Sequence, residues 1–289
     1  MPGADPVSDS GAAGNLTSAP GNNLALRVVS ALVMAPLAVA AAWYGGWAFT
    51  LFWGLAAIAV AWEWIALVTG PGHRLVFSSG ASALAIAALI GWRDHPTGAV
   101  LLVGLGALAA TVFAPHRRRG WVAAGILYAG VMLVAPLFLR QDPVYGFGAI
   151  VFLFAVVWAS DILAYFGGRT FGGPKLFAAV SPKKTWSGAI CGTLGAIGCA
   201  AAGSAWFGAG NLEAMALVAL VLSVASQGGD LFESWIKRRF GAKDASHLIP
   251  GHGGVMDRLD GFWAAALVGC LIGLSRGGFE DAARGLLVW

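Results

Sequence analysis

The sequence predicts an all-α membrane protein that crosses the bilayer about nine times, and three observations lead to this fold class. Of the 289 residues, 58% are hydrophobic and only 11% are charged, whereas about 25% of residues are charged in soluble domains. Long apolar runs recur along the chain, and the basic residues between them are distributed unevenly. So few charges cannot cover a soluble surface, which excludes an ordinary soluble domain and a nucleic-acid-binding module.

The spans follow from length, because a membrane-spanning helix needs about 20 mostly apolar residues. Residues 1–23 are rich in Gly, Ala, Ser, Pro and Asn and are predicted to form a flexible tail. After this tail, the predicted spans are 26–43, 47–69, 75–91, 98–114, 121–139, 147–166, 188–208, 212–236 and 258–275.

The basic residues predict the orientation. Under the nine-span topology, four of the 18 Lys and Arg residues (Arg93, Arg140, Arg276 and Arg284) lie on one side, and the other 14 lie on the side of the N-terminus. Basic loops stay in the cytoplasm, so we expect a cytoplasmic N-terminus and a C-terminus outside. The expected location is the cell (inner) membrane.

The end of span eight carries a polar helical face. Asp230, Glu233, Ser234 and Lys237 follow each other at i, i+3, i+4 and i+7. Asp230 lies about seven residues, or roughly 10 Å, inside the cytoplasmic boundary, and a charge at that depth needs a partner. A structural Asp–Lys pair and a ligand site both remain open. The preceding Gly228-Gly229 predicts that another group, for example a ligand, approaches the helix closely here.

The segment before span nine combines glycine, histidine and carboxylates. Pro250-Gly251-His252-Gly253-Gly254 provides a flexible backbone that can wrap phosphate oxygens, and a helix N-terminus follows, which favours anions. Asp257 and Asp260 share a face there. With Asp230 they suit Mg²⁺, which prefers oxygen ligands shared with substrate phosphates. Simple capping of the helix is the alternative.

The end of span six and the next loop are basic. Asp161 and Tyr165 lie one turn apart and Arg169 follows, and the loop then presents Lys183 and Lys184 beside hydroxyls. Lysine binds phosphate as a point charge, so this composition suits a polyphosphate. A strip that contacts anionic lipid headgroups is the alternative.

Two further features leave their roles open. Glu63, between two tryptophans in span two, either lines the same cavity or is a partnered structural acid. Span seven has glycines at 188, 192, 195 and 198, a spacing that allows close helix–helix approach.

The stretch from Ser234 to Asp260 resembles the signature of the phosphatidate cytidylyltransferase family (CDP-diacylglycerol synthases). The matching residues are Ser234, Lys237-Arg238, Lys243-Asp244, Ser246, Pro250, His252-Gly253-Gly254 and Asp257-Arg258-Leu259-Asp260. Upstream, the stretch from Asp161 to Arg169, the Ser-Pro-Lys-Lys-Thr loop and the Gln-x-Gly-Asp-Leu-x-Glu-Ser run also resemble the family. One position departs from it, because Ser187 stands where the family usually has Glu.

The resemblance implies a nucleotidyltransferase of phospholipid biosynthesis that converts CTP and phosphatidate into CDP-diacylglycerol and pyrophosphate, and it implies a homodimer. We expect Mg²⁺ on Asp230, Asp257 and Asp260, with a second cation left open. The remaining expected catalytic residues are Ser234, Lys243 and His252. The expected substrate contacts are Asp161, Tyr165, Arg169, Lys183, Lys184, Lys237 and Arg258.

Almost all of the expected site residues fall in the second half of the chain. We therefore expect a set of N-terminal transmembrane helices (24–140) and a C-terminal transmembrane catalytic region (141–289), with the site at the cytoplasmic face. Another membrane nucleotidyl or lipid-phosphate transferase is the alternative within enzymes. From a different class, an ion-coupled transporter would place its acids near the midplane, often within repeated halves. Here the acids gather at one face and the chain shows no internal repeat.

Overall fold

The computed structural model describes residues 20–70, 73–93, 96–207, 211–249 and 253–289, which are mostly helical. Each predicted span corresponds to one long helix. The helices are α1 (Pro20–Tyr44), α2 (Gly46–Thr69), α3 (Arg74–Trp92), α4 (Pro96–Phe113), α5 (Arg119–Arg140), α6 (Gly146–Phe171), α7 (Trp186–Phe207), α8 (Leu212–Arg239) and α9 (Met256–Gly277), with a short η1 (His116–Arg118) and α10 (Ala282–Leu287).

Eight helices in the described part of the chain, α2 to α9, are long and apolar enough to cross a membrane, and Leu32–Tyr44 of α1 is a shorter apolar segment. This finding confirms an all-α polytopic membrane protein. The helix α1 begins at Pro20, near the end of the stretch predicted as a tail, and proline suits the first turn of a helix. Residues 1–19 of the predicted tail lie outside the described residues.

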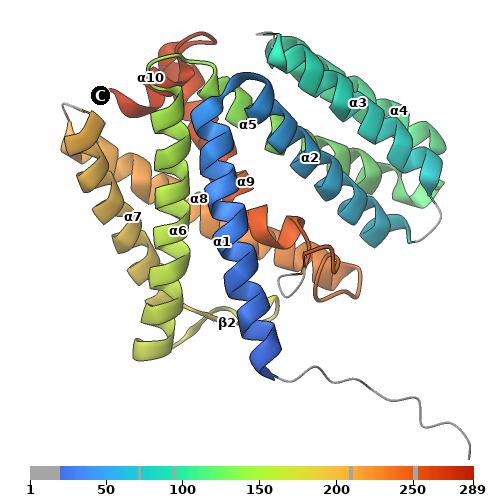
Figure 1. The fold of residues 1–289 in the computed structure, drawn as a ribbon. Helices are drawn as coiled ribbons and strands as arrows, with labels where there is room; N and C mark the ends of the chain where they lie inside the picture. The colour runs from blue at the N-terminus through green and yellow to red at the C-terminus, as the bar shows by residue number, and fades with distance from the viewer. Residues whose placement is uncertain (1–19, 71–72, 94–95, 208–210, 250–252) are drawn as a thin grey trace, which may run out of the picture.

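The helix α9 lies at the centre of the fold and packs against α2, α5, α6, α8 and α10. The start of α1 and the hairpin before α7 lie at one end of the molecule, and α10 and the C-terminus lie at the opposite end (Figure 1).

The all-α prediction omits one small sheet. Strands β1 (Lys175–Phe177) and β2 (Ser181–Thr185) form an antiparallel hairpin between α6 and α7. Two short, mostly polar strands give little hydrophobic alternation in the sequence, so periodicity could not indicate them.

The glycines serve contacts within the chain. A Cβ atom on Gly229 would come within 2.5 Å of the Asp260 carbonyl oxygen, so this glycine admits the backbone of α9. The predicted close approach is confirmed at Gly229, and the group that approaches is α9 and not a ligand. On α7, Cβ atoms on Gly188 and Gly192 would approach the carbonyl oxygens of Ala164 and Ser160 at 2.7 and 2.6 Å. The close approach predicted for this span is therefore made with α6.

Candidate active site

Asp230 meets a lysine from the hairpin. Its carboxylate forms an ion pair with Lys184 of β2, and Ser234, one turn later on α8, donates a hydrogen bond to Asp230 Oδ1 at 3.4 Å. The side chains of Lys184 and Asp230 are 27% and 32% exposed. An ion pair as open as this leaves both groups accessible to an incoming anion or cation.

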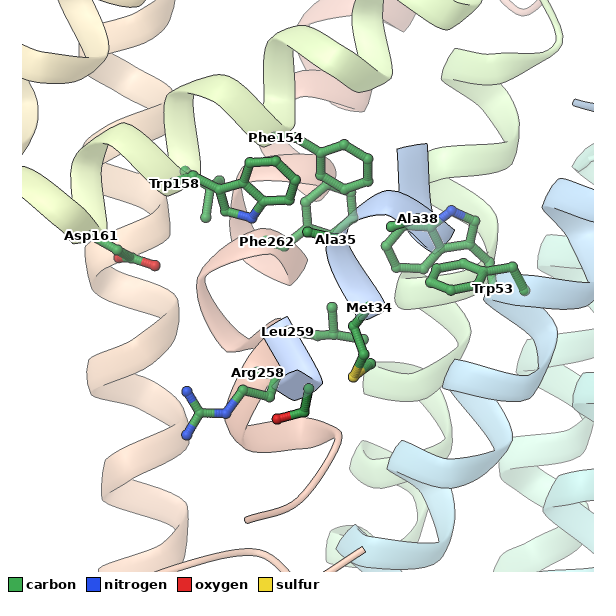
Figure 2. A pocket seen from close by; sticks show the side chains of 13 residues that line it. Met34, Ala35, Ala38, Trp53, Phe154, Trp158, Asp161, Arg258, Leu259 and Phe262 are labelled. Carbon is green, nitrogen blue, oxygen red and sulfur yellow. The ribbon is translucent and has the colours of Figure 1, made fainter. Parts of the chain in front are cut away.

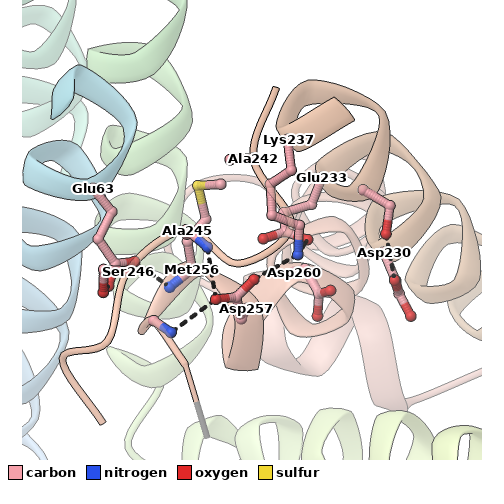
Figure 3. A network of polar contacts seen from close by, with 12 residues as sticks. Glu63, Asp230, Glu233, Lys237, Ala242, Ala245, Ser246, Met256, Asp257 and Asp260 are labelled. Carbon is pink, nitrogen blue, oxygen red and sulfur yellow. Dashed lines mark hydrogen bonds and ion pairs between the residues drawn. The ribbon is translucent and has the colours of Figure 1, made fainter. Parts of the chain in front are cut away.

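Lys237 joins two acids on neighbouring helices. Its Nζ atom lies 2.6 Å from Glu233 Oε2 on α8 and 2.5 Å from Asp257 Oδ1 on α9 (Figure 3). The other oxygen of Asp257 accepts hydrogen bonds from the backbone N–H groups of Ala245, at 3.0 Å, and Gly254, at 2.7 Å. Both oxygens of Asp257 are thus engaged by protein donors, and Lys237 is placed as a link between helices.

Asp260 lies between this cluster and Asp230 (Figure 3). One of its oxygens accepts the N–H of Gly261 at 2.7 Å. Among the described residues, no three His, Cys, Asp or Glu side chains are grouped closely enough to hold a metal ion together. Mg²⁺ usually takes only one or two carboxylates and completes its shell with water and phosphate oxygens. Asp230 and Asp260 suit such a site, whereas Asp257 would have to give up its present partners.

A basic pocket of about 610 Å³ opens beside Asp230. Arg169 of α6 donates a hydrogen bond to the hydroxyl of Tyr165 at 3.1 Å within it. The residues that line this basic pocket include Asp161, Tyr165, Arg169, Lys183, Lys184, Thr185, Gln227 and Asp230. The structure therefore brings together the side chains predicted from the end of span six, the loop after it and span eight.

An apolar pocket of about 330 Å³ lies on the other side of Asp161. Its walls are mostly aliphatic and aromatic, and two charged residues, Asp161 and Arg258, line it (Figure 2). Phe154, Trp158 and Phe262 form an aromatic wall, in which Phe154 stacks on Trp158 with ring centroids 5.1 Å apart. Asp161 lines both pockets, so it marks their common boundary.

Three further residues that the sequence analysis singled out either line neither pocket or lie outside the described residues. Lys243 is exposed on the loop after α8 and lines neither pocket. His252 lies outside the described residues. Ser187, the departure from the family pattern, donates a hydrogen bond to the carbonyl of Gly172 and contacts the hydroxyl of Thr185 at 3.0 Å. Its observed role is to join the start of α7 to the end of α6.

Sequence reasoning missed two contributors. Gln227 donates hydrogen bonds to Thr193 and Ser223, both at 3.1 Å, and also lines the basic pocket. Its position one turn before Asp230 was an available signal. Helix α1 adds Ser30, Met34, Ala35 and Ala38 to the apolar pocket, and a mostly apolar run within a predicted span gave no indication of this role.

Comparisons with known proteins identify the family of the chain. A profile of the cytidylyltransferase family matches residues 25–274. A phosphatidate cytidylyltransferase of Brucella abortus is 42% identical over 264 residues, which covers 87% of this chain and 94% of the relative. A protein of the same name from Rickettsia bellii is 35% identical over 169 residues, which covers 56% of this chain and 72% of the relative. Another from Haemophilus influenzae is 40% identical over 142 residues, which covers 47% of this chain and 49% of the relative. The chain therefore belongs to the cytidylyltransferase family.

Proposed function

We propose that the chain transfers the cytidylyl group of CTP to phosphatidate and releases CDP-diacylglycerol and pyrophosphate. The observation that carries this proposal is the boundary at Asp161, where a basic pocket and an apolar pocket meet. A reaction between a soluble polyphosphate and a lipid phosphate needs two such compartments side by side. Family membership and the names of the relatives support the same reaction.

Each pocket suits one substrate. The lysines and Arg169 of the basic pocket would neutralise the triphosphate of CTP, because compact ammonium groups bind phosphate oxygens well. The apolar pocket would receive the lipid, where Arg258 would contact its phosphate and the aromatic wall would contact its hydrocarbon. Each substrate would then present its reacting phosphate towards Asp161.

The chemistry follows from this placement. An oxygen of the phosphatidate phosphate attacks the α-phosphorus of CTP, a new P–O–P bond forms, and the bond from the α-phosphorus to the bridging oxygen of pyrophosphate breaks. The lipid phosphate is already an anion, so no general base is required. The chain contributes orientation and charge neutralisation. Lys243 and His252 stay candidates for phosphate contacts, and Ser234 stays a candidate for a hydrogen bond to the substrate or to a metal-bound water.

Magnesium dependence belongs to this proposal. Asp230 and Asp260 would hold Mg²⁺, with Asp257 the third candidate. The bound ion would supply positive charge to the triphosphate and the leaving pyrophosphate. The donor set supports this choice, because carboxylates are hard oxygen ligands and phosphate oxygens would complete the shell.

We further propose an inner-membrane protein whose catalytic face is cytoplasmic. The excess of basic residues on the side of the N-terminus supports this orientation. The hairpin, the last turns of α6 and α8, and the start of α9 all lie at that end. Homodimerisation stays a prediction from the resemblance, and the two glycines of α7 described above contact α6 of the same chain.

The test uses purified protein in detergent micelles with Mg²⁺, phosphatidate and CTP labelled at the α-phosphate. We expect label to enter the lipid fraction with release of pyrophosphate, and we expect Asp230→Asn to abolish the transfer. Glu213→Gln, at the opposite end of α8, is the matched control and should keep full activity. Folded wild-type protein that transfers no label would refute the proposal, and activity in detergent without any gradient would exclude transport as the main function.

A further inference from the structure

Glu63 on α2 is a buried acid that lines neither pocket. Its side chain has no exposed surface, yet it lies at the edge of the polar network (Figure 3). Three donors converge on its carboxylate: the Ser246 hydroxyl at 2.6 Å, the Val255 N–H at 2.8 Å and the Met256 N–H at 2.7 Å. Of the two roles left open by the sequence, the structure supports the partnered acid.

The contacts with Val255 and Met256 cap α9 from another helix. The first N–H groups of a helix have no partner within it and carry partial positive charge. The side chain of Val255, at the N-cap position, offers no hydrogen bond to these groups. Glu63 supplies the missing acceptor, and its approach requires Gly254, because a Cβ atom there would lie 2.6 Å from Glu63 Oε1.

The contact with Ser246 extends this clamp to the loop after α8. Ser246 donates to Glu63 and also accepts the N–H of Leu248 at 3.1 Å. Asp257 binds the neighbouring backbone of the same loop, because its carboxylate accepts hydrogen bonds from the N–H groups of Ala245 and Gly254. The two carboxylates, one from α2 and one from α9, therefore hold both ends of the same loop next to the start of α9.

We propose that Glu63 is a positioning residue for the transfer reaction and acts through the start of α9, where it sets the places of Asp257 and Asp260. This inference rests on the proposed function, since the measured step is cytidylyl transfer. A displacement of about 1 Å in a catalytic group can lower a rate about 100-fold. A residue that contacts no substrate can therefore control the rate of the chemical step.

The test compares Glu63→Gln with the wild type, after the folded fraction has been measured by size exclusion in detergent. We expect kcat per folded protein to fall about 10- to 100-fold, while KM for CTP and for phosphatidate each change less than about twofold, as expected when transition-state interactions alone are lost. Hydrogen–deuterium exchange at the amides of Val255 and Met256 should become faster. Ser246→Ala, which removes one of the three donors, should show the same pattern with a smaller loss of kcat.

Thr50→Val is the matched control, because Thr50 is a buried residue of the same helix whose hydroxyl donates to the Gly46 carbonyl far from the loop. It should leave kcat per folded protein unchanged, and the hydrogen–deuterium exchange rates of the Val255 and Met256 amides should also stay unchanged. An unchanged kcat per folded protein in Glu63→Gln would overturn the inference, and so would a change confined to one KM. Inactive wild-type protein would refute the proposed function instead, while the exchange data would still report on the clamp.

Discussion

Replacing Lys237 by methionine tests the buried link between α8 and α9. The Lys237 side chain is 11% exposed, and those of its partners Glu233 and Asp257 are 0% and 6% exposed. Removal of one member of a buried ion pair costs about 3–5 kcal/mol, because it leaves a charge without compensation in a poorly solvated place. Asp257 keeps its two backbone donors, so Glu233 is the acid that is left without a partner. We therefore expect Lys237→Met to lower the free energy of unfolding by about 3–5 kcal/mol.

The assay is the free energy of unfolding in mixed micelles, measured by titration with a denaturing detergent. Lys184→Met is the matched control, since its ion pair with Asp230 is about one third exposed, and exposed pairs contribute about 0–1 kcal/mol. The double variant with Lys237→Met and Glu233→Leu should recover much of the loss, because apolar replacement of a buried pair is often neutral. A loss below about 1 kcal/mol for Lys237→Met would refute the reasoning.

Three further predictions concern substrates, packing and the metal. Arg258→Gln should raise KM for phosphatidate about 10-fold and leave KM for CTP unchanged, since a hydrogen bond to a charged group contributes about 1.5–3 kcal/mol. Lys183→Gln should instead raise KM for CTP and leave KM for phosphatidate unchanged. A variant that raises both KM values equally would contradict the assignment of one pocket to each substrate. Gly192→Leu should destabilise the protein by more than about 1 kcal/mol through overpacking against α6 in the same detergent titration, whereas Gly198→Leu, with open space around it, should not. Removal of Mg²⁺ by a chelator should abolish transfer, and added Mg²⁺ should restore it; full activity without divalent cations would remove the metal from the proposal.

The sequence predicted the helices well because each one follows from a local property, the length of an apolar run. The boundaries of α2, for example, differ from the predicted span by one residue at its start and by none at its end. The end of α6 was harder, because its last turns carry Gly167, Gly168 and Arg169, yet the helix continues to Phe171. Composition there no longer distinguishes a helix from a loop.

The candidate site was predicted as a set of residues but not as a set of contacts. Spacing along one helix placed Asp230, Glu233 and Lys237 on one face, and Glu233 and Lys237 do pair. The lysine that reaches Asp230 comes instead from β2, and the clamp on the loop comes from Glu63 on α2. Partners of this kind depend on tertiary packing between distant segments, which periodicity does not report.

The position of Asp161 between two pockets has a consequence for the order of events. In the proposed function each substrate has a separate compartment, so both reactants can be present at once and neither has to leave before the other arrives. No protein-bound cytidylyl group is then needed to carry the nucleotide from one substrate to the other. Initial rates measured against both substrate concentrations should therefore give intersecting double-reciprocal lines, the pattern of a ternary complex, whereas a covalent relay through the protein would give parallel ones.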